Sequence, residues 1–366
     1  MLHKDLSSVQ RRWTDYWHRE NHDRPMLSLY APLGIPGPAR PKPPASLEER
    51  WLDIDYVLKM GRANIETTYY GGDAFPNLWP NLGPDIMGAI CGGCDIAFGD
   101  ITSWAIGEVT DWETHPPLVF DEKNIWWQRL WHMTERMVKD SHGDYLVGIT
   151  DLHPGSDGLV SLRGPENLCL DLMDCPEQFD RRSGEMFAVY KQVFTRLSGL
   201  ISGGQKGSTN WMGMWKEQDW YIVCSDFSCL ISEDVYNTKI APGIEAELDF
   251  LGTGMYHLDG PGNLRHLDRI LGMEKLNGVQ WVPGVDRPAA RFWLDVLRKI
   301  QKAGKNIWIE CFPEDVEEVC QALEPEGLNL VMYLSDRDTA ERIERRVTEI
   351  YAEKRHSIIS TAPAHR

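Results

Sequence analysis

Four short apolar runs in the last third of the chain each precede a segment with helical periodicity. The runs are 254–259 (GMYHLD), 278–283 (GVQWVP), 306–311 (NIWIEC) and 328–335 (LNLVMYLS). An apolar run without alternation that leads into an amphipathic helix is typical of a buried parallel strand. Repeated units of this kind predict a parallel sheet or barrel, whose chemistry lies at the carboxyl ends of the strands. Those ends carry His257, Asp259, Trp281 and Glu310.

The earlier part of the chain predicts further strands and helices. The predicted strands are 26–31, 145–150, 208–214 and 221–225, and the predicted helices include 46–61, 125–140, 165–175 and 176–198. About eight strand candidates, most of them followed by a helix, fit a single α/β domain with the (β/α)8 TIM-type barrel architecture. An open doubly wound sheet is the alternative, but no GxGxxG follows the first strand, which disfavours a dinucleotide fold.

One long segment interrupts this pattern. Residues 69–117 are rich in Gly, Pro, Asn and Trp and show no periodicity. A loop of this length in a compact domain is usually a lid or a binding loop. We therefore expect one barrel over residues 1–355, with 69–117 as a lid-like insertion over the carboxyl-terminal face of the barrel and 356–366 as a flexible tail.

Composition narrows the class of partner. The net charge of −17 opposes binding to nucleic acid or to an anionic membrane surface. No apolar stretch approaches the roughly 20 residues that span a bilayer. The first residues, MLHKDLSSVQRRW, lack the apolar core of a secretory signal. The expectation is a cytoplasmic protein that acts on a small molecule.

The chain holds fifteen tryptophans, several times the ordinary usage for a chain of this length. Because a buried indole N–H needs a partner, core packing alone seldom requires so many. Trp211 and Trp215 would share one face of the predicted strand 208–214, with Gly213 between them. Together with Trp281 they suit a pocket for a flat or methylated ligand, although large residues that plug a barrel mouth would give the same pattern.

Polar residues at strand ends are the candidates for chemistry. Alternation places His257 and Asp259 on one strand face, where they would form a general acid–base pair, two metal ligands or a simple polar contact. Asp226 ends the strand in YIVCSD and is suited either to orient a cationic substrate or to cap the next turn. Asp151 and His153, in TDLHPGSD, lie at a similar position and are candidate substrate-binding residues.

Three further residues have alternative interpretations. Arg163 would clamp a substrate carboxylate or phosphate, or pair with Glu166 on the surface. Glu310 and Cys311 are candidate metal ligands, and by alternation only one of them points into the barrel.

Taken together, these residues resemble the uroporphyrinogen decarboxylase-like superfamily, which includes the decarboxylase and cobalamin-dependent methyltransferases. The resemblance covers most of the chain. It is clearest in 147–179 (VGITDLHPGSDGLVSLRGPENLCLDLMDCPEQF), 225–248 (SDFSCLISEDVYNTKIAPGIEAEL) and 252–271 (GTGMYHLDGPGNLRHLDRIL). It implies a (β/α)8 barrel with its active site at the carboxyl ends of the strands.

The chain also departs from the family patterns. The Arg-rich MRQAGR stretch with which the decarboxylase grips substrate carboxylates is missing, and Arg24 is the one arginine near the first strand. The zinc-dependent methyltransferases of the superfamily carry His-x-Cys and a later Cys. Here His257 matches the histidine, Asp259 replaces the first cysteine, and Cys311 is an approximate third ligand. Such a set of ligands favours a harder metal or a more weakly bound zinc.

The leading hypothesis is a methyltransferase that moves a methyl group between a small methylated or aromatic substrate and a corrinoid carried by a partner protein. His257 and Asp259 would polarise the leaving group, directly or through zinc, while Asp226 orients the substrate. The alternatives are a decarboxylase and a non-catalytic barrel that captures a ligand. A homodimer is a further expectation.

Overall fold

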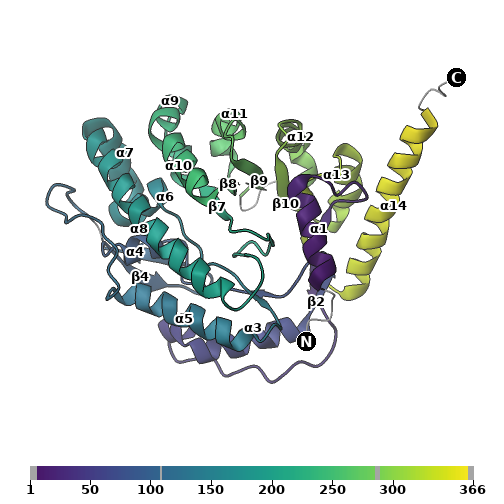
Figure 1. Ribbon diagram of the computed structural model, residues 1–366, viewed down its shortest axis with the longest axis horizontal. Coiled ribbons are helices and arrows are strands. Elements are labelled where there is room, and N and C mark those ends of the chain that lie inside the picture. Colours follow the sequence, from purple (N-terminus) through teal and green to yellow (C-terminus); the bar gives the residue numbers. More distant parts are fainter. Residues whose placement is uncertain (1–5, 108, 285–288, 362–366) are drawn as a thin grey trace. The chain divides into compact units, whose positions relative to one another are not determined.

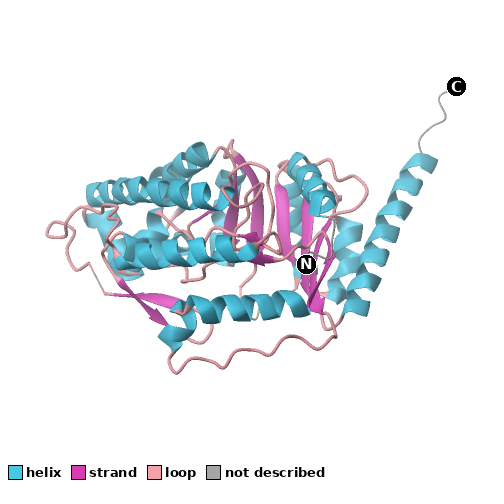
Figure 2. Cartoon of the chain, turned by 60° about the horizontal axis from the view of Figure 1, so that its bottom comes forward, coloured by secondary structure: helices cyan, strands magenta, loops and turns pink. Residues whose placement is uncertain are grey.

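The structure is a computed structural model that describes residues 6–107, 109–284 and 289–361 (Figure 1). The chain is a mixed α/β protein with many helices, drawn in cyan in Figure 2, and with parallel strands, drawn in magenta. It divides into two compact units. The first unit comprises residues 38–64 and 76–276, and the second comprises the described residues of 2–37, 65–75 and 277–366.

The second unit is built on a sheet with the strand order β2-β1-β11-β10-β9. Its strands are β1 (Met26–Pro32), β2 (Thr68–Gly72), β9 (Leu276–Val282), β10 (Asn306–Glu310) and β11 (Leu328–Tyr333). β1, β11, β10 and β9 run parallel, whereas β2 pairs with β1 in the antiparallel direction. Most side chains of the parallel strands are buried. This burial explains why their sequences show apolar runs and no alternation.

α1 (Leu6–His18) precedes β1, and further helices alternate with the last strands of this unit. These are η4 (Ala290–Trp293), α12 (Leu294–Lys302), η5 (Pro313–Asp315), α13 (Val316–Ala322) and α14 (Arg337–Thr361). α12 buries Leu297 and Ile300, and α13 buries Val316 and Val319. The strand–helix order predicted for the last third of the chain is therefore confirmed. α14 continues to Thr361, beyond the predicted start of the tail at residue 356, and residues 362–366 lie outside the described part of the chain.

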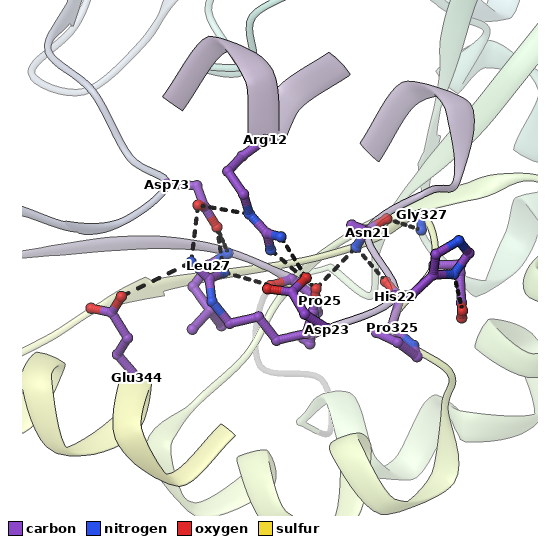
Figure 3. Close-up of polar contacts among 12 residues, drawn as sticks. Arg12, Asn21, His22, Asp23, Pro25, Leu27, Asp73, Pro325, Gly327 and Glu344 are labelled. Atoms are coloured by element: carbon purple, nitrogen blue, oxygen red, sulfur yellow. Dashed lines mark hydrogen bonds and ion pairs between the residues drawn. The ribbon is translucent and has the colours of Figure 1, made fainter. Parts of the chain in front are cut away.

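A buried carboxylate ties the first elements of the second unit together. Asp73, 2% exposed, accepts hydrogen bonds from Arg24 at 2.6 and 3.1 Å and from the backbone N–H of Leu27 at 2.9 Å. The Arg12 side chain of α1 lies 3.5 Å from the same carboxylate, and Figure 3 shows Asp73 facing both Arg12 and Leu27. Arg24, the arginine nearest the first strand, is therefore occupied by a structural ion pair.

The first unit holds the parallel pair β7 (Tyr221–Cys224) and β8 (Gly254–Asp259) and the short parallel pair β3 (Asn77–Leu78) and β6 (Leu146–Val147). Its longest helices are α3 (Ile54–Thr67, which ends in the second unit), α5 (Ile125–Ser141) and α8 (Pro176–Ser202), and α5 and α8 lie side by side in Figure 1. The remaining helices are α2 (Leu47–Leu52), α4 (Ile86–Ile90), α6 (Gly155–Arg163), α7 (Pro165–Asp174), η1 (Asp226–Leu230), α9 (Glu233–Val235), η2 (Tyr236–Ile240), α10 (Ala241–Leu251), η3 (Pro261–His266) and α11 (Leu267–Leu271).

Two strand predictions in this unit need correction. The predicted strand 208–214 is wrong, because the segment forms only isolated bridges at Ser208 and Asn210. Asn210 starts a turn instead: its carbonyl accepts the N–H of Gly213 at 3.0 Å, and Gly213 takes a positive φ of 66°. The predicted strand 145–150 shrinks to the two residues of β6 and a bridge at Ile149.

The segment 69–117 is more regular than its composition predicts. It contains part of β2, then β3 and α4, and a hairpin of β4 (Asp95–Phe98) and β5 (Ser103–Ile106). Short elements of this kind bury few residues each, so their periodicity is too brief to show in the sequence. In the described part of the chain, no helix is long and apolar enough to cross a membrane.

Candidate active site

The carboxyl ends of β7 and β8 bring together three side chains that the sequence analysis singled out. Asp226 follows β7, and His257 and Asp259 lie on β8. One ligand atom from each lies within 4.8 Å of the other two, and among the described residues this is the group with metal-binding spacing. His257 and Asp259 thus lie on one side of the strand, as their alternation predicts.

Local backbone geometry holds the β8 end of this group. Gly260 follows Asp259 with φ of 74°, a conformation that an L-residue rarely adopts, and turns the chain directly after the carboxylate. The Asn263 side chain donates to the Asp259 carbonyl at 2.9 Å. Trp211 packs edge-on against the His257 ring, with centroids 5.8 Å apart and planes at 80°.

Asp226 opens the 3-10 turn η1, but its own side chain is not the cap. The Asp157 carboxylate, from the first turn of α6, accepts the backbone N–H groups of Asp226 and Phe227, each at 3.0 Å. The alternative in which Asp226 caps the turn therefore gives way to capping by Asp157. This leaves the Asp226 carboxylate available to the metal-binding group.

A cavity of about 300 Å³ adjoins Asp226. Its polar lining consists of Asp85, His153, Asp157 and Asp226, and its apolar lining consists of Pro84, Val160, Pro165, Phe227 and Leu230. The volume is at the lower end of the range for small-molecule sites, about 300–1,000 Å³. The predicted tryptophan walls are absent from the described lining of this cavity, where Phe227 is the aromatic residue.

A chain of polar contacts links Asp151, His153, Cys224 and Asp157, of which His153 and Asp157 line the cavity. The Asp151 carboxylate lies 2.6 Å from His153 Nε2, and His153 Nδ1 lies 2.8 Å from the Cys224 sulfur. The Cys224 thiol in turn donates to Asp157 Oδ2 at 3.2 Å. Asp151 and His153, the predicted substrate-binding pair, are thus joined to each other, and His153 also reaches the cavity wall.

The ionisable side chains of this region shift one another's pKa values. Burial alone would lower the pKa of His153, but the charge of Asp151 and its contact with the ring raise it to about 9. The pKa of Asp226 rises to about 6 because partial desolvation of its carboxyl and repulsion by Asp157 disfavour the ionised form, against the attraction of His257, although the residue itself is exposed. Burial likewise raises the pKa of Asp85. At neutral pH the cavity therefore carries a protonated His153 imidazole, and the pKa values of Asp85 and Asp226 lie above the usual range of a carboxyl.

Arg163 and Trp215 serve the structure of the first unit. Arg163 forms a bidentate ion pair with Asp171 at 2.8 and 2.9 Å, and it also donates to the carbonyl groups of Val109 and Thr110. Its ion-pair partner is thus Asp171 and not Glu166, while the substrate clamp stays a prediction. Trp215 is 3% exposed, and its indole N–H donates to the Lys206 carbonyl at 3.1 Å, as expected for core packing.

Three predicted site residues belong to the second unit. Trp281 of β9 is fully buried and packs against Trp293, with ring centroids 5.1 Å apart. Glu310 is exposed at the end of β10, whereas Cys311 is 1% exposed and its burial raises the pKa of the thiol. Neither Glu310 nor Cys311 belongs to the group with metal-binding spacing.

Asp85, Asp157, Cys224 and Glu247 line the two cavities of this region but are not among the predicted site residues. Glu247 of α10 is 4% exposed, and burial raises the pKa of its carboxyl to about 8. It lines a second, small cavity of about 30 Å³ with Ser156 and Cys224. The acidic position in the first turn after Pro154 was a usable signal for Asp157 as a capping residue, and the position of Cys224 two residues before Asp226 was a signal for that thiol. No sequence pattern marks Asp85 or Glu247.

Comparison with known proteins defines the class of fold. No family model matches the chain, and no curated protein matches it. Among solved structures, a methyltransferase from Methanosarcina mazei aligns with a TM-score of 0.59 and 9% identity, over 94% of this chain and 99% of that chain. The chain therefore shares its fold with this methyltransferase over most of its length.

A second solved structure aligns less well. It is a B12-independent methionine synthase from Shewanella sp. W3-18-1, at a TM-score of 0.42 and 9% identity, over 92% of this chain and 99% of that chain. This likeness is too weak to identify a shared fold.

Proposed function

We propose that the chain is a methyltransferase-type enzyme that binds a metal ion through Asp226, His257 and Asp259. The observation that carries the proposal is the convergence of three ligand atoms within 4.8 Å at the carboxyl ends of β7 and β8, beside a cavity of about 300 Å³. The likeness of the fold to that of a methyltransferase supports it.

The donor set fits a divalent metal. One imidazole and two carboxylates suit zinc, bound less tightly than by thiolates, or a harder ion such as manganese. The raised pKa of Asp226 also fits, because a cation between these side chains would replace the proton that relieves the repulsion among the carboxylates. When bound, the metal would supply Lewis acidity to a leaving oxygen or nitrogen.

The cavity residues would hold the methyl donor. Val160, Phe227 and Leu230 offer apolar contacts for methyl or aryl groups, while Asp226 joins the cavity to the metal-binding group. In transfer, the bond from the methyl carbon to oxygen or nitrogen would break, and its electron pair would stay on the donor atom, which would take up a proton. The methyl carbon would form its new bond with the electron pair of a reduced corrinoid, at the cob(I)alamin level, carried by a partner protein. A closed barrel with 69–117 as its cover is part of this proposal.

The decarboxylase alternative is less well supported. A decarboxylase of this type needs arginine side chains for several substrate carboxylates. Arg24 is held by Asp73 and Arg163 by Asp171, so the two arginines that the sequence analysis weighed are already engaged.

The first prediction tests metal binding and turnover together. The purified protein should contain about one equivalent of zinc, and cob(I)alamin should change its spectrum when a methyl donor is supplied from a panel of methoxyarenes and methylamines. His257→Ala should lose both properties. His132→Ala, a change at an exposed histidine of α5, is the matched control and should keep both.

Two results would count against the proposal. A metal-free protein that transfers no methyl group from any donor of the panel would contradict the proposal. Tight ligand binding in which turnover never appears would favour a ligand-capturing protein instead.

A further inference from the structure

We infer that Asp157 is a positioning residue for Asp226: its carboxylate holds the backbone from which Asp226 reaches the metal-binding group. The inference rests on the proposed metal site and goes beyond it, because Asp157 is not a member of that group.

The contact is made through two consecutive amides. Asp157 Oδ2 accepts the N–H of Asp226, and Oδ1 accepts the N–H of Phe227, each at 3.0 Å. Ser225, directly before them, is extended, with φ of −156° and ψ of 90°. A carboxylate that binds two successive N–H groups fixes the point at which the extended chain enters the 3-10 turn. That point sets the direction in which the Asp226 side chain leaves the backbone.

Further contacts fix the position of the Asp157 carboxylate. Asp157 belongs to the first turn of α6, and the Cys224 thiol donates to its Oδ2 at 3.2 Å. His153 and Asp151 continue the chain of contacts, at 2.8 Å from the Cys224 sulfur and 2.6 Å from His153 Nε2. Groups that orient metal ligands typically work through fixed hydrogen bonds of this kind.

The hydrogen bonds of Asp157 require an ionised carboxylate at this position. Its carboxylate accepts three hydrogen bonds, from the amides of Asp226 and Phe227 and from the Cys224 thiol. A neutral asparagine would accept one of the two amides and turn an N–H₂ group toward the other, where two donors would face each other. Only a carboxylate accepts both amides and the thiol.

The experiment measures backbone protection and zinc affinity separately. Hydrogen–deuterium exchange of the segment that carries Asp226 and Phe227 is followed in the zinc-free protein, and zinc binding is followed by isothermal titration. Asp157→Asn should speed the exchange and weaken zinc binding by roughly 10–100-fold. Cys224→Ala, which keeps both amide contacts, should give a smaller change in the same direction and serves if Asp157→Asn fails to fold.

Asp53→Asn is the matched control. Asp53 Oδ1 also accepts two consecutive amides, those of Asp55 and Tyr56 at 3.0 and 3.2 Å, at the start of α3. Zinc affinity and exchange near Asp226 should be unchanged in this variant. Thermal unfolding of each variant shows whether the fold is retained.

The outcomes separate the two proposals. If the wild type binds no zinc, the proposed metal site fails, and the exchange data alone decide whether Asp157 anchors the turn. If the wild type binds zinc and Asp157→Asn binds it equally well, Asp157 does not position the ligand. Unchanged exchange near Asp226 in Asp157→Asn would overturn the anchoring role.

Discussion

Glu247 is a single side chain whose protonation state is set almost entirely by its surroundings. Burial raises the pKa of its carboxyl to about 8, with a smaller rise from the charge of Asp157 and a fall from that of His153. A carboxylic acid with a raised pKa holds its proton in the folded state over a range where the unfolded chain has already lost it. The native state is therefore favoured at low pH and loses stability as the pH rises from about 4.5 through about 8.

Replacing Glu247 by glutamine tests whether ionisation of this side chain lowers the stability of the folded protein as the pH rises. The Glu247→Gln variant cannot ionise, so its stability relative to the wild type should increase between about pH 5 and about pH 9, by on the order of 2–4 kcal/mol. Urea unfolding across that range is the measurement. Glu245→Gln, which loses a half-exposed ion pair with Arg269, should show a difference nearly independent of pH over the same range. A relative loss of stability of Glu247→Gln at high pH would show that the native protein stabilises an ionised Glu247.

His153 adds to the same trend. Its pKa of about 9, raised by Asp151 against the effect of burial, means that the native state binds a proton which the unfolded chain releases near pH 6.5. Its contribution to stability is full below about pH 6.5 and is lost as the pH rises through about 9. Asp151, His153 and Cys224 all lie near strand ends, but the contact between His153 and Cys224 joins residues 71 positions apart, which no local pattern reveals.

At the scale of elements, the buried Asp73 carboxylate holds several segments together through its contacts with Arg12, Arg24 and Leu27. We call this group the Asp73 network. Burial alone would raise the pKa of Asp73, but the attraction and hydrogen bonds of Arg24 outweigh it and hold the pKa below its usual range. The network contributes stability at neutral pH, and that contribution is lost as the pH falls below about 4. It joins α1, β1 and the residue after β2 within the second unit.

Removal of this charge should be costly. Asp73→Asn leaves Arg24 without its carboxylate partner, and we expect the free energy of unfolding to fall by about 3–5 kcal/mol. The control is Asp100→Asn, because Asp100 pairs with Arg50 but its side chain is 83% exposed. That change should cost less than about 1 kcal/mol. Equal urea midpoints for the two variants would mean that the buried pair adds nothing over a surface pair.

Element predictions succeeded where burial was continuous. β8 occupies the predicted residues 254–259, and β9, β10 and β11 differ from prediction by one or two residues at most ends. These strands are covered by helices, so their apolar runs record burial directly. The prediction failed at 208–214, where Trp211, Met212 and Met214 also form an apolar run. There, the turn at Asn210 and Gly213 determines the backbone, and Met212 and Met214 are buried although the segment forms no strand ladder.

For the whole molecule, metal binding should appear as stability. A ligand that binds only the native state stabilises it by about 2.7 kcal/mol at a concentration 100 times its Kd. Zinc should therefore raise the Tm of the metal-free protein by several degrees, and a chelator should reverse the rise. His257→Ala should melt at the same temperature with and without zinc. An equal rise in that variant would indicate that zinc binds the surface, where the net charge of −17 attracts any cation.

The sequence by itself determined the strand–helix order of the last third of the chain and the acidic and histidine residues at the ends of β7 and β8. It did so because burial and strand alternation are local properties, written into consecutive residues. Tertiary structure decided which of those polar residues work together. It grouped Asp226 with His257 and Asp259, bound Arg163 to Asp171, and set Asp157 behind Asp226. Such contacts depend on which distant segments the packed strands and helices bring within hydrogen-bond distance, and the spacing of residues along the chain does not contain that information.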